Sequence, residues 1–104
     1  MQSDNLRLTV ADKMRYSVRD AISAREIASN LMKEYELDKA VNYGLPEIDD
    51  RKHIWRIVII NKSDDSRIGE VVLSARTSLI DEKMSTKKEL LEQRLLKRDI
   101  SNKG

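Results

Sequence analysis

Two apolar runs separated by a short polar segment dominate the second half of the chain. The runs span residues 53–61 and 67–75, and both are rich in β-branched side chains. The segment between them, Lys62-Ser-Asp-Asp-Ser66, has the composition of a turn. The pattern predicts an antiparallel hairpin whose first strand holds the only tryptophan, Trp55.

The two faces of this hairpin differ in character, because successive side chains of a strand point to opposite sides. The odd-numbered positions carry no charge and are predicted to lie under a helix: Trp55, Ile57, Ile59, Gly69, Val71, Leu73 and Ala75. The even-numbered positions are mixed: Ile54, Arg56, Val58, Ile60, Ile68, Glu70, Val72 and Ser74. This even face is apolar enough that we expect something else to shield part of it.

A helix is predicted over residues 24–37, where apolar residues recur at three- and four-residue steps. Ser23 and Glu26 have the spacing of a capping box, and Ile22 and Ile27 have that of a hydrophobic staple. Residues 14–22 have compatible spacing and could add a short turn upstream.

The remaining segments give weaker patterns. Residues 6–10 alternate between apolar and polar, which predicts either a short edge strand or a loose arm. Gly44-Leu45-Pro46 predicts a break before the hairpin, followed by a charged loop over residues 47–52. Leu79 and Ile80 could start a brief third strand.

A second capping box, Thr86 to Glu89, predicts a C-terminal helix through about Asp99. Its apolar positions wind around the helix instead of forming one stripe: Leu90, Leu91, Leu95, Leu96 and Ile100. Such a helix either docks loosely on its own domain or packs against another chain. Residues 1–5 and 101–104 are expected to be flexible.

Together these elements predict one α+β domain of 104 residues, with a helix packed on an antiparallel hairpin or three-stranded sheet and a C-terminal helix across it. Charged residues make up 37% of the chain, above the roughly 25% typical of globular proteins. This composition indicates a small core in a solvated shell, or a core that a partner completes.

The formal net charge is only +2, so charge alone implies no acidic partner. Residues 53–104 are mildly basic, with eleven Lys and Arg against eight Asp and Glu. The candidate nucleic-acid or partner contacts are Lys87, Lys88, Arg94, Lys97 and Arg98, all in or next to the C-terminal helix. Glu89, Glu92 and Asp99 dilute this basic set.

Residues with catalytic potential are sparse. Cysteine is absent, His53 is the only histidine, and the three glycines lie too far apart for a phosphate-binding loop. The paired carboxylates fall in predicted turns, where Asp commonly bonds to its own backbone. We therefore expect no catalytic, metal-binding or cofactor-binding residues and no enzyme activity. The longest apolar run, Ile57 to Ile60, predicts no membrane span, and we expect a soluble, cytoplasmic protein.

Two stretches resemble PepSY-type domains over roughly residues 20–80. Asp20-Ala-Ile-Ser-Ala-Arg-Glu-Ile-Ala28 looks like their opening helix. Residues 54–60 and 70–80 are similar to their hairpin, which commonly ends in Asp-Ala-x-Thr-Gly-x-aliphatic. Ala75, Thr77 and Ile80 match this ending, whereas Ser74 replaces the acid and Ser78 replaces the glycine. The resemblance implies a small non-catalytic module that binds or inhibits another protein, in a family that is usually exported or membrane-associated.

The function that these observations predict is a non-catalytic protein-interaction or regulatory module. Its partner would be another protein or a second copy, joined through the C-terminal helix or the sheet face. One alternative is a nucleic-acid-associated accessory protein that uses the basic C-terminal helix. Another is a regulatory domain that acts on a separate or larger enzyme.

Overall fold

The structure is a computed structural model that describes the backbone of residues 16–103 and the side chains of residues 16–96. Its elements are α2 (Ala21–Glu34), the 3-10 helix η1 (Asp38–Ala40), β1 (Val41–Tyr43), β2 (Glu47–Asp49), β3 (Ile54–Asn61), β4 (Arg67–Ser74) and α3 (Lys88–Lys103). The predicted α+β class is confirmed, with a four-stranded antiparallel sheet. The predicted strand at residues 6–10 and the flexibility of residues 1–5 lie outside the described residues.

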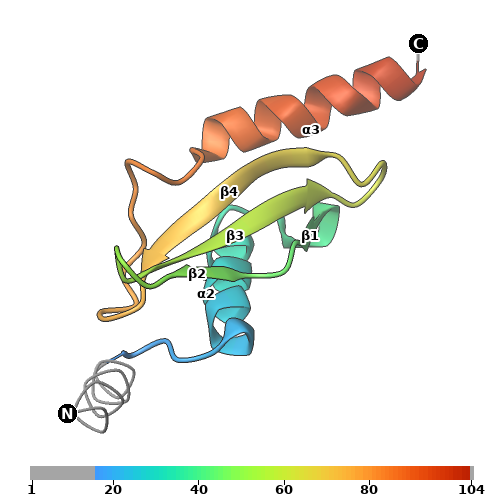
Figure 1. The fold of residues 1–104 in the computed structure, drawn as a ribbon. Coiled ribbons are helices and arrows are strands. Elements are labelled where there is room, and N and C mark those ends of the chain that lie inside the picture. Colours follow the sequence, from blue (N-terminus) through green and yellow to red (C-terminus); the bar gives the residue numbers. More distant parts are fainter. Residues whose placement is uncertain (1–15, 104) are drawn as a thin grey trace, which may run out of the picture.

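Strand β3 is the centre of the sheet (Figure 1). β4 pairs with one side of β3, while β1 and β2 pair one after the other with its other side. The registers of β1 and β2 on β3 differ by one residue, and Gly44-Leu45-Pro46 lies between them. The predicted break at this tripeptide therefore interrupts an edge strand. The prediction of a loop over residues 47–52 is wrong for β2, because a three-residue strand is too short to show an alternating pattern.

The hairpin of β3 and β4 is confirmed, and its odd face is the core face. Trp55, Ile57 and Ile59 are at most 6% exposed. A β-bulge changes the parity near the turn, since Ile59 pairs with Gly69 while Ile60 pairs with Arg67. The extra residue, Ile68, is 1% exposed and belongs to the core cluster, so its predicted place on the even face is wrong.

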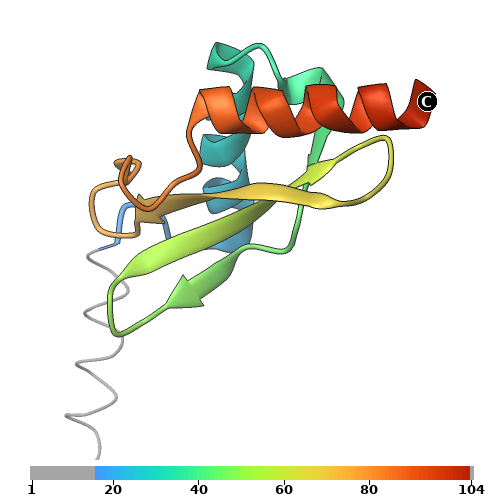
Figure 2. The ribbon, with the colours of Figure 1, turned by 90° about the horizontal axis from the view of Figure 1, so that it is seen from above.

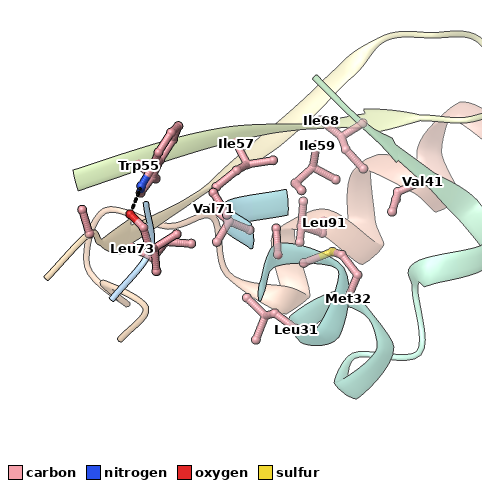
Figure 3. Packing of buried hydrophobic residues seen from close by; sticks show 14 of the residues in the cluster. Leu31, Met32, Val41, Trp55, Ile57, Ile59, Ile68, Val71, Leu73 and Leu91 are labelled. Atoms are coloured by element: carbon pink, nitrogen blue, oxygen red, sulfur yellow. Dashed lines mark hydrogen bonds between the residues drawn. The ribbon is translucent and has the colours of Figure 1, made fainter. Parts of the chain in front are cut away.

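Helix α2 covers the core face of the sheet, as predicted. Its buried residues Ala24, Ala28, Leu31 and Met32 join the core cluster with the odd positions of β3 and β4 (Figure 3). The indole Nε1 of Trp55 donates to the Val18 carbonyl at 2.9 Å, which fixes the segment leading into α2 against the sheet (Figure 3).

The predicted start of α2 is wrong. The N-cap is Asp20, whose carboxylate accepts from the Ser23 amide at 2.7 Å, so Ser23 lies inside the first turn. Ile22 is 71% exposed and forms no staple. The Asp20 cap therefore adds one turn before the predicted start, ahead of the fully buried Ala24.

Helix α3 lies along β4, on the side of the sheet away from β1 and β2 (Figures 1 and 2). It begins at Lys88 and extends to Lys103, four residues beyond the predicted end. Leu91 is fully buried, whereas Leu90 and Leu96 are 39% and 62% exposed. The predicted third strand at Leu79 and Ile80 is a single bridge between Ile80 and Leu73.

Candidate functional site

The sheet has one face without a helix among the described residues. Figures 1 and 2 show α2 on one side of the sheet and α3 beside β4. We call the opposite side the open face. It is formed by Asn42 of β1, Glu47 and Asp49 of β2, Ile54, Arg56, Val58 and Ile60 of β3, and Arg67, Glu70, Val72 and Ser74 of β4.

The apolar part of the open face follows the central strand. Ile54, Val58 and Ile60 are half-buried, and Val72 of the neighbouring strand is fully buried. β-branched side chains at these positions suit a pleated surface and lose little rotamer freedom on contact with another surface. The strand therefore presents a narrow apolar ridge that water only partly covers.

An ion-pair network crosses the middle of this ridge. The carboxylate of Glu70 binds Arg56 Nη1 and Arg67 Nη2, each at 3.2 Å. The side chains of Arg56 and Glu70 are 34% and 22% exposed, whereas that of Arg67 is 64% exposed. Pairs that retain this much solvent contribute at most about 1 kcal/mol to folding. The network fixes side-chain directions on the face more than it stabilises the domain.

The charges at the centre of the open face balance. Glu47 is the cross-strand partner of Arg56, so the two arginines lie among two glutamates. Asp49 lies at the end of the face and accepts from the backbone amides of Arg51 and Lys52. The Lys52 amide holds the pKa of Asp49 below its ordinary value. Its carboxylate is thereby committed to its own turn.

The outer edge of β4 is closed by the chain that follows it. Backbone groups of Glu70 bond to the Thr86 amide and hydroxyl at 2.9 Å each. The Val72 amide donates to the Ser85 hydroxyl at 2.8 Å, and the Val72 carbonyl accepts from the Asp81 amide at 2.8 Å. Arg94 of α3 donates to the Ile68 carbonyl. No further strand can pair with this edge without displacing those contacts.

His53, directly before β3, joins three segments at the end of the hairpin. Its Nδ1 lies 2.6 Å from the Tyr16 hydroxyl, and its Nε2 lies 3.1 Å from Arg76 Nη2. Because a guanidinium can only donate, Nε2 accepts, and in the neutral ring Nδ1 carries the proton and donates to Tyr16. Both ring nitrogens are thus engaged, and the cluster is structural in character.

Two tyrosines beside α2 have phenol groups whose acidity is reduced. Burial raises the pKa of Tyr43, and the Ser29 hydroxyl opposes that shift. Burial also raises the pKa of Tyr35, with further contributions from Glu82, Glu34 and Glu89. Both shifts keep the phenol protonated, which is the opposite of what a tyrosine nucleophile or base needs.

The basic residues predicted as contacts do not form one free surface. Lys87 is exposed and precedes α3, and Lys88 is half-buried at its first position. Arg94 donates to the sheet edge, so its guanidinium is part of the domain's own packing. Lys97 and Arg98 fall within α3, but their side chains lie outside the described set. Their role as nucleic-acid or partner contacts stays a prediction.

Among the described residues, no group of three or more His, Asp or Glu side chains is arranged to hold a metal ion. The described helices include none with the length and apolar character needed to cross a membrane. Compared with known proteins, the chain matches no family model, no curated protein and no solved structure. The resemblance to PepSY-type domains therefore stays a prediction.

The alternation that defines the open face is visible in the sequence. The sequence did not reveal that no described helix would cover this face. The closed β4 edge and the Tyr16–His53–Arg76 cluster were both missed, because their partners lie 13 to 37 residues apart and no local pattern links them.

Proposed function

We propose that this chain is a non-catalytic protein-interaction module that binds its partner through the open face. The observation that carries the proposal is the combination of a half-buried apolar ridge with a preset ion-pair network, on a sheet side that none of the described helices covers. Such a surface offers apolar area together with directed charges, which are the features of a specific protein contact.

The rest of the described surface supports this choice. Helix α2 covers the core face, and the connection to α3 closes the β4 edge. Both ring nitrogens of His53 are engaged, and the carboxylate of Asp49 serves its own turn. These groups stabilise the fold, whereas the open face holds half-buried apolar residues that no described helix covers.

The test replaces Ile60 with a photo-crosslinking amino acid in the full chain, which is expressed in its native cells. Ile60 is half-buried on the open face, whereas Lys39, the matched control position, is exposed on η1. We expect a discrete protein adduct from position 60 and none from position 39. Adding Arg56→Glu should reduce the yield several-fold, because it sets two carboxylates against each other on the face. Equal adducts from both positions, or none from position 60, would contradict the proposal.

A further inference from the structure

We propose that the partner of the open face is a second copy of this chain, related to the first by a two-fold axis that lies in the interface, parallel to the plane of the sheet. This inference rests on the proposed function and names the occupant of the same surface. It follows from the charge pattern of the open face and from the poor fit of the other surfaces to a symmetric contact.

A two-fold interface requires a patch that is complementary to itself. Arg56 and Glu70 lie side by side at the middle of the open face, joined at 3.2 Å. Rotation by half a turn about an in-plane axis that passes midway between them, perpendicular to the line joining them, places Arg56 of one copy over Glu70 of the other, and the reverse. Each ion pair then becomes a four-charge network of alternating sign. The balance of Arg56 and Arg67 against Glu47 and Glu70 means that two copies bring no net charge together at this centre.

The apolar residues fit the same axis. Val58 pairs with Glu70 across the strands, so it lies next to the proposed axis, with Ile54 and Ile60 towards the two ends of β3. The half-turn brings the ridge of one copy against the ridge of the other. The ridge side chains that are half-buried in the single chain would become buried in the dimer.

The alternative surfaces for a second copy are less suitable. Sheet extension at β4 is blocked by the bonds from Thr86, Ser85 and Arg94. Extension at the opposite edge meets two three-residue strands separated by Pro46, which has no amide to donate. On α3, the exposed Leu90 and Leu96 are six residues apart and hence about 120° apart around the helix, so they form no seam.

The area of the open face sets the expected strength. Strand β3 has eight residues and is therefore about 26 Å long, and three strands are about 14 Å wide. The flat footprint of about 360 Å² per copy is less than half of the roughly 800 Å² typical of stable complexes. We therefore expect a weak, concentration-dependent dimer with a dissociation constant on the order of 100 µM.

The test is sedimentation equilibrium of the full chain from about 10 µM to about 1 mM, with three variants. Val58→Lys places an unpaired charge beside the axis and should weaken association at least about tenfold. Arg56→Glu should do the same, and adding Glu70→Arg should restore association, since the swapped pair is again complementary. Leu96→Lys on α3 is the control and should leave the dimer unchanged. Circular dichroism and Trp55 fluorescence show whether each variant is folded.

Two sedimentation results would overturn the inference. One is a wild-type chain that stays a monomer of 12.0 kDa at about 1 mM. The other is a dimer that Leu96→Lys dissociates while folded Val58→Lys retains it, which would place the contact on α3. The cross-linking experiment separates this inference from the proposed function. An adduct of twice the chain mass at position 60 supports both, whereas an adduct with a different protein supports the function and overturns the second copy.

Discussion

Asp20 fixes the first turn of α2 through its own side chain. The carboxylate accepts from the Ser23 amide, and this bond is the main cause that holds the pKa of Asp20 below its ordinary value. A carboxylate whose pKa is lower in the folded state stabilises that state above its unfolded pKa. The contribution is lost as the pH falls through the folded value.

We expect Asp20→Asn to retain the cap at pH 7 and to lose the acid-dependent part of the stability. Asp20→Ala should lose the cap at every pH and lower the melting temperature, because the Ser23 amide loses its partner. Urea unfolding followed by circular dichroism at pH 7 and at pH values around 3 measures both effects. An Asp20→Asn chain whose stability falls with acid as steeply as the wild type would show that other carboxylates dominate.

His53 adopts a left-handed backbone conformation, with φ at 56°, which is uncommon for a residue other than glycine. The bonds from its ring to Tyr16 and Arg76 offset that cost. Replacing His53 by Ala keeps the strained backbone and removes both bonds, so we expect a loss of about 1–3 kcal/mol in the free energy of unfolding. His53→Asn should lose less, because asparagine tolerates this conformation.

Denaturation followed by Trp55 fluorescence measures this change, since the indole binds Val18 in the segment that the cluster fastens. Equal losses for His53→Ala and His53→Asn would show that the ring contacts, and not the backbone, decide the effect. The sequence could not reveal this role. A single histidine gives no pattern, and its partners at positions 16 and 76 become neighbours only after the sheet has formed.

Gly69 in β4 determines how closely the start of α3 approaches the sheet. Its φ is not positive, so the requirement is for space. An added Cβ would lie 2.6 Å from the Thr86 hydroxyl and 2.8 Å from Leu91 Cδ2. Gly69 keeps the regular register opposite Ile59, directly next to the β-bulge at Ile68.

We expect Gly69→Val to cost about 1–3 kcal/mol by pushing Thr86 and Leu91 away from β4. Gly44→Ala is the comparison, because its Cβ would lie 3.1 Å from Val58 Cβ and otherwise make only ordinary contacts, at 3.8 Å with the Val58 carbonyl and 3.9 Å with Ile60 Cδ1. Thermal unfolding of both variants measures the difference. A Gly44→Ala chain that loses as much stability as Gly69→Val would show that glycine is needed for another reason.

The long elements were predictable, and the short ones were not. The hairpin followed from two eight-residue strands with clear alternation, and the body of α2 followed from the spacing of Ala24, Ala28 and Leu31. The start of α2 was missed because Asp20, three residues before the predicted cap Ser23, supplies the capping carboxylate. β1 and β2 have three residues each, and their pairing comes from the neighbouring strand instead of their own composition.

The whole molecule places its contacts unevenly around the sheet. One face is packed on α2, one edge is bonded to the connection before α3, and the open face has no described helix. The open face was visible in the sequence as a mixed row of side chains. Its candidacy as a binding surface depends on the covering of the core face by α2 and on the bonded edge of β4. Both contacts join residues that are far apart in the chain.

The same arrangement bears on the nucleic-acid alternative. Arg94 is held at the sheet edge, while Glu89 and Glu92 lie beside Lys88 on α3. With a net charge of +2, the chain has little electrostatic attraction for a polyanion.

We expect a fluorescent duplex DNA to show no measurable binding to the wild type at about 150 mM salt, and the double variant Lys87→Glu, Lys88→Glu to behave identically. Binding that falls steeply with salt and disappears in that variant would instead favour the nucleic-acid function.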